Sequence, residues 1–453
     1  MSVISARAGE PGPLIRGWRA PTPTGPVDVE LQLPGSKSLT NRYLALAALA
    51  AQPSRLRMPL RSRDTILMAT GIARLGARVT DVPVRDPAQL RLAGDDWEVA
   101  PIPEGTGSEV PVGVDCGLAG TVMRFLPPVA AATAHAARFD GDPRARQRPL
   151  AQLLRALAAM GASVEAAAGF LPATVGAPRG GLSGGDIEID ASESSQFVSG
   201  LLLIGARCRN GLTLRHVGAP VPSRPHIDMT VENLRDVGVV VDDGQPDVWR
   251  VEPGEVGALD VEVEPDLSNA GPFLAAALAT AGRVRVLGWP QYTTQAGDLF
   301  RDVLDAMGAD VVLDRGGLTV TSNGTIYGAD LDLSAAGEIA PTVAALAALA
   351  EGPTRIRGIG HLRGHETDRL QALADEIKNL GGDVRILPDG LEIHPRPLHG
   401  GPFRSYADHR MATTGAVLGL RVPGIVVDDI STTGKTMPDF PGMWSAMTAV
   451  AER

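Results

Sequence analysis

The stretch Pro34-Gly-Ser-Lys-Ser-Leu-Thr-Asn-Arg42 decides how the rest of the chain is organised. Before it, apolar and polar residues alternate over residues 27–33, which is typical of a half-buried strand. After it, apolar residues recur at helical spacing over residues 39–50, so the stretch turns the chain from a strand into a helix. Ser36 or Ser38 can cap that helix.

The start of this helix has the features of an anion site. The first N–H groups of a helix lack partners within it and carry partial positive charge, which favours a bound anion. Lys37 lies at that end, and Ser38 and Arg42 are four residues apart, so they share a helix face. The alternative is a capped helix with solvated basic residues, and a short motif alone does not decide between the two.

The composition is that of a globular protein and excludes several classes. The chain has 453 residues, of which 44% are hydrophobic, 21% charged and 4% aromatic. This length predicts about two to four domains. The net charge of -10 gives no support for a nucleic-acid or membrane-surface partner. Cys116 and Cys208 form no disulfide framework or metal spacing, and no apolar run is long enough to span a membrane, so we expect a cytoplasmic protein.

One pattern recurs six times along the chain. A polar turn precedes an apolar helix at Ser36, Cys116, Ser192, Leu267, Ser334 and Ala407, and the steps between these positions are 80, 76, 75, 67 and 73 residues. The later helices of this kind are expected at residues 197–206, 273–281, 342–350 and 411–420. They are apolar all round and should be buried on every side.

A second, amphipathic helix follows in each unit, as at residues 64–75 and 298–307, and a final one at 441–450 ends the chain. Five of these helices end at a glycine suited to a left-handed cap: Gly76, Gly161, Gly238, Gly308 and Gly381. Six units predict two lobes of three, divided near residues 263–266. We expect residues 1–26, rich in Gly, Pro and Arg, to form a loose tail.

Two cofactor motifs are incomplete. Thr433-Gly-Lys-Thr436 resembles the end of a P-loop, but Asp429 occupies the position of its first glycine. His365 begins like a zinc motif, but Arg369 stands in the position of the second histidine. His361 is four residues from His365 and no third ligand lies nearby, so a metal pair is the less favoured interpretation.

Basic residues are concentrated at the loops that begin helices, although the protein as a whole is acidic. They are Lys37, Arg42, Arg124, Arg148, Arg369, Arg410 and Lys435. Each could pair with a local acid, but their repeated placement predicts a positive cleft between the lobes for a small, multiply anionic ligand. In the same loops, Glu338 and Glu366 are candidate proton carriers, and Ser194, Ser195 and Gln196 are neutral donors.

Motifs over nearly the whole chain resemble one family. They are residues 33–42, 118–121 with Arg124, 148–149, 194–196, 366–369, 408–411 and 435–436. Together they resemble the EPSP synthase (3-phosphoshikimate 1-carboxyvinyltransferase) family. The resemblance implies transfer of the enolpyruvyl group of phosphoenolpyruvate to the 5-hydroxyl of shikimate 3-phosphate, with release of phosphate, on the shikimate pathway to chorismate and the aromatic amino acids.

The resemblance also implies an α/β (α+β) fold of two lobes, each with three βαβαββ units and buried parallel helices. This is the inside-out α/β barrel of enolpyruvyl transferases and RNA 3′-terminal phosphate cyclases. The first strand pairs with the C-terminal lobe, so residues 1–35 and 266–453 should form that lobe and residues 36–265 the other. The lobes close on the two substrates without a metal or organic cofactor. We expect a monomer with no nucleic-acid or membrane partner.

The resemblance assigns roles to individual residues. Lys37 contacts both substrates, and Gln196 contacts either one. The further ligands of shikimate 3-phosphate are Ser38, Arg42, Ser194, Ser195, Ser223, Glu338 and His365. Those of phosphoenolpyruvate are Gly120, Arg148, Arg369, Arg410 and Lys435. The catalytic residues are Lys37, His365, Glu338 as the base near the 5-hydroxyl, and Glu366 as a candidate acid for the methylene carbon.

Two positions depart from the family pattern. Glu338 stands where the family usually has Asp, and His365 stands where many members have Lys. Either the cleft keeps His365 protonated, or its role is hydrogen bonding. The first alternative predicts that activity falls at high pH as His365 titrates.

Two other functions are possible. The sister enzyme that uses UDP-N-acetylglucosamine usually carries a Cys in a basic mobile loop, but Cys116 lies outside any Arg-rich loop. A non-catalytic anion-binding homologue would keep the fold, but binding alone does not require the acids Glu338 and Glu366.

Overall fold

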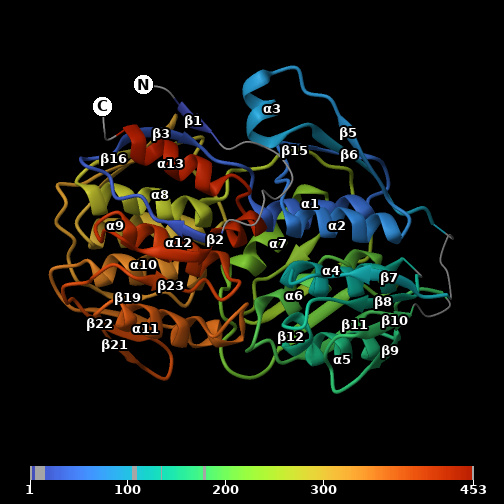
Figure 1. Cartoon of the computed structure of the whole chain (residues 1–453). Helices are drawn as coiled ribbons and strands as arrows, with labels where there is room; N and C mark the ends of the chain where they lie inside the picture. Colours follow the sequence, from blue (N-terminus) through green and yellow to red (C-terminus); the bar gives the residue numbers. More distant parts are fainter. Residues whose placement is uncertain (1–2, 6–15, 105–109, 134, 177–179, 451–453) are drawn as a thin grey trace.

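The computed structural model describes residues 3–5, 16–104, 110–133, 135–176 and 180–450. Figure 1 shows two lobes side by side. Buried apolar residues form two separate clusters. One, which defines the N-terminal lobe here, consists of residues between 39 and 263. The other, which defines the C-terminal lobe, contains Val27, Val29, Leu31 and Leu33 with residues between 267 and 447. Leu92 also belongs to this second cluster, although its neighbours in the sequence pack in the first. We propose the predicted boundaries at residues 35 and 265 as domain limits.

The N-terminal lobe has three four-stranded sheets in the orders β15-β4-β6-β5, β7-β8-β10-β9 and β11-β12-β14-β13. The strands are β4 (Ser54–Arg57), β5 (Arg78–Val82), β6 (Asp96–Ala100), β7 (Val112–Asp115), β8 (Ala137–Asp140), β9 (Ser163–Ala166), β10 (Ala173–Gly176), β11 (Gly185–Ile189), β12 (Leu212–His216), β13 (Val241–Asp242), β14 (Val248–Val251) and β15 (Asp260–Glu262). In each sheet the first pair is parallel and the other pairs are antiparallel.

The C-terminal lobe has sheets in the orders β1-β3-β16-β18-β17, β19-β20-β22-β21 and β2-β24-β23. The strands are β1 (Val3–Ser5), β2 (Arg16–Arg19), β3 (Asp28–Gln32), β16 (Arg283–Leu287), β17 (Asp310–Asp314), β18 (Gly317–Thr321), β19 (Asp330–Asp332), β20 (Thr354–Arg357), β21 (Asp383–Ile386), β22 (Leu391–His394), β23 (Pro402–Phe403) and β24 (Val426–Asp429). The βαβαββ order is complete in the first two units of this lobe, whereas in the described chain the third sheet has three strands and takes β2 from near the N-terminus.

The first helices of the units lie inside the lobes. They are α1 (Lys37–Leu49), α4 (Gly120–Ala132), α6 (Ser195–Leu202), α8 (Leu267–Thr280), α10 (Ala340–Ala348) and α12 (His409–Gly419). Every residue of α10 is buried, as its apolar sequence predicts. The three first helices of the C-terminal lobe contact one another, whereas in the N-terminal lobe α4 contacts both α1 and α6.

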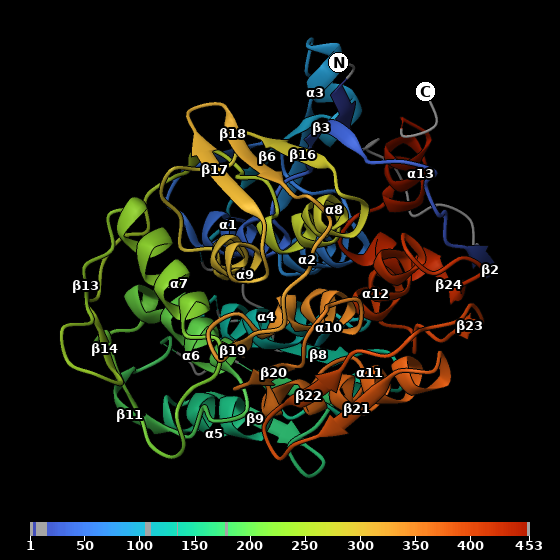
Figure 2. The same cartoon turned by 90° about the vertical axis from the view of Figure 1, so that its left-hand side faces the viewer.

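The second helices carry exposed faces. They are α2 (Arg63–Arg74), α5 (Ala151–Ala159), α7 (Pro225–Asp236), α9 (Phe300–Ala306), α11 (Arg369–Asn379) and α13 (Phe440–Val450), and α3 (Pro87–Ala93) is an addition to the first unit. Figure 2 shows α9 and α11 toward the outside of α8 and α10, respectively. The glycines predicted to end five of them all have positive φ, between 78° and 104°. Of the helices described, none is long and apolar enough to cross a membrane.

The two lobes exchange their first strands. β3 precedes α1 in the chain but pairs in parallel with β16 of the C-terminal lobe, and β15 precedes α8 but pairs in parallel with β4 of the N-terminal lobe. The two crossing segments meet at a bridge between Gly35 and Pro265. Ser36 N donates to Glu264 O at 2.7 Å, and Asp266 N donates to Pro34 O at 3.0 Å. The opening stretch is therefore one of two paired connections between the lobes.

Three expectations from the sequence need correction. Residues 16–26 are not a loose tail, because β2 pairs with β24 and Ala20 is buried, while residues 1–2 and 6–15 lie outside the described part. The helix expected at residues 197–206 ends at Leu202 and is followed by a separate 3-10 turn, Gly205–Arg207. The helix expected to begin at residue 273 begins at Leu267, because Asp266 caps it.

Gly35 at the crossing has no room for a side chain. A Cβ there would lie 2.5 Å from Met58 O and 3.0 Å from Val263 Cγ1. We expect Gly35→Ala to lower the free energy of unfolding by about 1–3 kcal/mol, since the crossing segments must move apart. Urea unfolding measures the change. Gly254→Ala is the matched control, because a Cβ at Gly254 meets nothing within 4 Å. Equal stability of the two variants would contradict the prediction.

Candidate active site

A cavity lies where the first helices of both lobes begin. Residues from six such helix starts line it: Lys37 and Ser38 of α1, Gly120 and Thr121 of α4, Gln196 of α6, Ser268 of α8, Glu338 just before α10, and His409 and Arg410 of α12. Helix N-termini carry free N–H groups and partial positive charge. The fold itself therefore makes this cavity favourable for anions.

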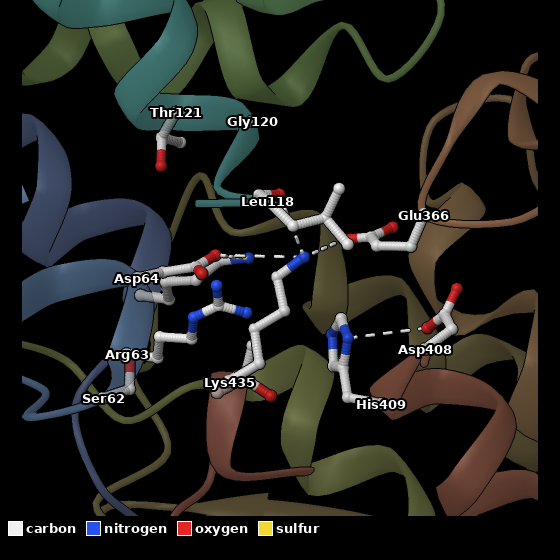
Figure 3. A network of polar contacts seen from close by, with 12 residues as sticks. Ser62, Arg63, Asp64, Leu118, Gly120, Thr121, Glu366, Asp408, His409 and Lys435 are labelled. Carbon is white, nitrogen blue, oxygen red and sulfur yellow. Dashed lines mark hydrogen bonds and ion pairs between the residues drawn. The ribbon is translucent and has the colours of Figure 1, made fainter. Parts of the chain in front are cut away.

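Lys435 connects the lobes beneath the cavity. It ends the 3-10 helix η6 (Ile430–Lys435), and its Nζ forms an ion pair with Glu366. The same Nζ lies 4.0 Å from Asp64 Oδ2 and 3.5 Å from Leu118 O, both in the N-terminal lobe. Figure 3 shows the ammonium group of Lys435 between Glu366 and Asp64. Asp64 also lies 3.5 Å from the Nζ of Lys37, so this carboxylate lies between two lysines.

Arg369, the first residue of α11, is held by two carboxylates. Its Nε donates to Asp408 Oδ2 at 2.8 Å, and its Nη2 donates to Asp408 Oδ1 at 3.1 Å and to Glu366 Oε2 at 3.0 Å. Burial lowers the pKa of Arg369, but the charges of Asp408 and Glu366 outweigh this and raise it. Arg369 is therefore a fixed cation at the edge of the cavity.

Arg148 and Arg410 are bound differently. Arg148 Nη1 donates to Leu118 O at 3.2 Å, and Arg410 Nη1 donates to Ser268 O at 2.7 Å. In the described part of the chain, neither forms an ion pair with a carboxylate. Burial lowers the pKa of both guanidinium groups, and the nearby charge of Arg369 lowers it further. These two cations line the cavity with their charge unneutralised by direct contact.

Glu338 faces the cavity from the 3-10 helix η4 (Gly337–Ile339). Its Oε1 lies 2.9 Å from Nε2 of His226, near the start of α7 in the other lobe. Burial raises the pKa of Glu338, but His226, a backbone N–H and Arg410 outweigh burial, so the pKa lies below its ordinary value. Glu338 is therefore an ionised carboxylate at neutral pH.

Most of the residues that the sequence analysis singled out line this cavity. They are Lys37, Ser38, Gly120, Arg148, Gln196, Glu338, His365, Glu366, Arg369 and Arg410. Lys435 lies directly behind Glu366. The remaining five do not line it: Arg42, Arg124, Ser194, Ser195 and Ser223. Arg42 is only 1% exposed and is hydrogen-bonded to residues of α1 and α7, and the hydroxyl of Ser194 caps α6.

Sequence reasoning missed three residues of the site. His226 and Gln295 line the cavity, and Asp64 lies between Lys37 and Lys435. The sequence only weakly indicates Asp64 as a site residue, because it is an acid in the first turn of a helix that follows the basic stretch around Lys37. His226 and Gln295 belong to no recurring motif, and their neighbours in the cavity come from distant parts of the chain.

The structure bears on the two alternatives for His365. Arg369 Nη1 lies 3.2 Å from His365 Nδ1, and since a guanidinium only donates hydrogen bonds, Nδ1 must be unprotonated. Burial and the charge of Arg369 lower the pKa of His365 well below its ordinary value. His365 is thus neutral in this structure, which favours the hydrogen-bonding alternative.

Glu366 is a carboxylate in this arrangement. Burial raises its pKa, but Lys435, Arg369 and Arg148 lower it well below its ordinary value. It therefore has no proton to donate while these cations surround it.

The histidine pair His361 and His365 is a candidate metal site on sequence grounds alone. The two rings stack edge to face with centroids 5.7 Å apart, and among the described residues no group of three His, Cys, Asp or Glu side chains is arranged to hold a metal ion.

The two-lobed repeat with a cation-lined cavity between the lobes defines the enolpyruvyl transferase type of fold. Two solved structures of EPSP synthase from Acinetobacter baumannii share it, with TM-scores of 0.76 and 0.74 at 23% sequence identity. The alignments cover 96% of this chain and 97% and 98% of those chains.

Sequence comparison gives the family. The family model described as EPSP synthase (3-phosphoshikimate 1-carboxyvinyltransferase) matches residues 21–444. A 3-phosphoshikimate 1-carboxyvinyltransferase of Kocuria rhizophila is 55% identical over 434 residues, which is 95% of this chain and 96% of the relative. This chain belongs to the EPSP synthase family.

Because His361 is buried, we predict that the free energy of unfolding falls in acid. Burial lowers the pKa of His361 to about 4, against about 6.5 for an unfolded chain. Between these values the unfolded state binds a proton that the folded state does not, so stability is lost as the pH falls through this window. We expect His361→Gln to reduce the pH dependence of the unfolding free energy by up to about 1.4 kcal/mol per pH unit.

Urea unfolding at pH 7, 6 and 5 measures this dependence. His399→Gln is the matched control, because His399 is exposed and its replacement should leave the slope unchanged. An identical slope for the unaltered protein and His361→Gln would refute the prediction.

Proposed function

We propose that this chain transfers the enolpyruvyl group of phosphoenolpyruvate to the 5-hydroxyl of shikimate 3-phosphate and releases phosphate. The observation that carries the proposal is that one cavity joins cations of both lobes to the ionised carboxylate of Glu338. Such a cavity suits two phosphorylated substrates and removal of a hydroxyl proton. Membership of the EPSP synthase family supports the same reaction.

Phosphoenolpyruvate is proposed to bind among Arg148, Arg369, Arg410 and Lys435. Its carboxylate and phosphate match the forked donors of arginine. Arg148 and Arg410 are bound to carbonyl oxygens and not to acids, so an anionic ligand can approach them without displacing a carboxylate.

Shikimate 3-phosphate is assigned to the side of the cavity lined by Ser38, Gln196 and Glu338. Lys37 lies in the first turn of α1 and serves both substrates in this proposal. His365, as a neutral side chain, contributes hydrogen bonds. Arg42, Ser194, Ser195 and Ser223 lie outside the lining and stay predicted ligands.

The proposed reaction begins with attack of the 5-hydroxyl oxygen on C2 of phosphoenolpyruvate. Glu338 takes the hydroxyl proton, and C3 gains a proton. The C2–O bond to phosphate then breaks with its electron pair leaving on the phosphate, and C3 loses a proton, which restores the double bond. The proton on Glu338 passes to phosphate or solvent. The surrounding cations stabilise the charge that builds on the departing phosphate.

Glu366 is the proposed proton donor to C3. In this structure Lys435, Arg369 and Arg148 keep it ionised. The anionic groups of phosphoenolpyruvate compete for the same cations, so binding raises the pKa of Glu366 toward the range in which it can carry a proton.

The structure argues against the rival transferase that uses a cysteine. Cys116 is fully buried, and burial raises the pKa of its thiol far above the ordinary value. A buried thiol of this kind is inert and cannot serve as the exposed cysteine of a mobile loop.

The monomeric state and the cytoplasmic location of this chain stay predictions. Light scattering measures the oligomeric state.

The direct test is phosphate release from phosphoenolpyruvate with either acceptor. We expect release with shikimate 3-phosphate and none with UDP-N-acetylglucosamine. Lys37→Ala and Glu338→Ala should each lower turnover by about 10²-fold or more, the scale of one acid–base or electrostatic group. Lys378→Ala, on the exposed end of α11, is the control for loss of a lysine. Absence of release with both acceptors would exclude both transferase functions.

Gly120 should determine affinity for phosphoenolpyruvate. A Cβ there would lie 2.9 Å from Arg124 Nη1, 3.1 Å from Arg148 Nη2 and 3.1 Å from Gln196 Oε1. We expect Gly120→Ala to displace Arg148 and raise KM for phosphoenolpyruvate by about 10-fold, the value of one hydrogen bond to a charged group. Steady-state kinetics measure this, with Gly113→Ala as control because a Cβ at Gly113 meets nothing within 4 Å. An unchanged KM would contradict the prediction.

A further inference from the structure

The contact between His226 and Glu338 joins the two lobes inside the cavity. His226 lies in α7 of the N-terminal lobe, and Glu338 lies just before α10 of the C-terminal lobe. Nε2 and Oε1 are 2.9 Å apart, and each side chain is only 17% exposed. Both residues line the cavity, so the contact lies where the proposed base must act.

The hydrogen bond leaves one carboxylate oxygen of Glu338 able to accept a proton from the substrate. An ionised carboxylate only accepts hydrogen bonds, so the proton between the two groups belongs to Nε2 of His226. Oε1 is occupied by this bond. Oε2 is then the oxygen that can take a proton from the acceptor hydroxyl, and rotation of the carboxylate is restricted.

The backbone of His226 is itself held firmly. Its carbonyl oxygen accepts from Arg42 Nη2 at 2.7 Å, from Thr230 Oγ1 at 2.9 Å and from Ser199 Oγ at 3.2 Å. Arg42 is 1% exposed, and its Nε also donates to Thr230 Oγ1 at 2.8 Å. Three helices, α1, α6 and α7, thus fix the position from which the imidazole reaches across to Glu338.

The length of Glu338 matches this partner. A side chain one methylene shorter would withdraw the carboxylate by about 1.5 Å, the length of one C–C bond. The separation of 2.9 Å would then exceed the hydrogen-bond range unless the backbone moved. The contact with His226 therefore requires the full length of a Glu side chain at position 338.

We propose that His226 is a positioning residue that orients Glu338 to remove the proton of the acceptor hydroxyl, an inference that rests on the proposed transfer reaction. Nε2 donates to Oε1, and the proton of the hydroxyl goes to Oε2 as its oxygen bonds to C2 of phosphoenolpyruvate. Since the partners belong to different lobes, the base is oriented only when the lobes are as close as they are here.

A set of four variants tests the pairing by steady-state kinetics with both substrates. His226→Gln can donate from the position of Nε2, whereas His226→Asn is too short to reach Glu338. Glu338→Asp shortens the partner, and the double variant His226→Asn with Glu338→Asp closes the cycle. His399→Asn is the control for loss of a histidine, because His399 is exposed.

We expect His226→Asn to lower kcat by about 10-fold to 10²-fold, the effect of a misplaced catalytic group, with KM for both substrates within about twofold of the unaltered protein. His226→Gln should keep most of the activity. In the Glu338→Asp background, His226→Asn should cost little more, because the contact it removes is already lost.

Three results would overturn the inference. They are equal losses for the Gln and Asn variants, fully additive losses in the double variant, and a raised KM for shikimate 3-phosphate with unchanged kcat, which would make His226 a substrate ligand. Phosphate release by the unaltered protein separates this inference from the proposed function. If that protein is active, the variants decide on His226 alone; if it is inactive with shikimate 3-phosphate, the proposed function fails and the inference fails with it.

Discussion

The structure depends on the convergence of six helix starts on one cavity between the lobes. The exchange of β3 and β15 makes this arrangement possible, because each crossing strand belongs to one lobe and leads into a helix of the other. Helix starts facing each other across the cavity would repel if nothing anionic lay between them. An anionic ligand between them would offset this repulsion.

Buried carboxylates keep the cations of the site in place. Asp64 lies between Lys37 and Lys435, and Asp408 and Glu366 hold Arg369. Burying these cations without partners would carry a large desolvation cost, and each carboxylate offsets part of it. Arg148 and Arg410 lack such partners and bind carbonyl oxygens. The site is thus a preorganised network in which some cations are neutralised and others remain available.

Local patterns predicted most of the secondary structure. Buried helices, amphipathic helices and the glycines that end them depend on side-chain periodicity and φ angles of neighbouring residues, so the sequence displays them directly. The segment at residues 16–26 was misjudged because its partner β24 lies near the other end of the chain. A short edge strand rich in Arg and Gly has no periodicity of its own to reveal such a partner.

By itself, the sequence determined the repeat, the buried helices and the cationic motifs at helix starts, because each is encoded within a few consecutive residues. The resemblance of those motifs to a known family indicated which reaction to expect. Only the tertiary structure decided that His365 is a neutral acceptor beside Arg369, that Asp64 lies between two lysines, and that His226 meets Glu338. The contacts of Asp64 with Lys435 and of His226 with Glu338 join the two lobes, and the state of His365 depends on its burial. Their distances and pKa values follow from burial and neighbouring charge, which exist only once the lobes have come together.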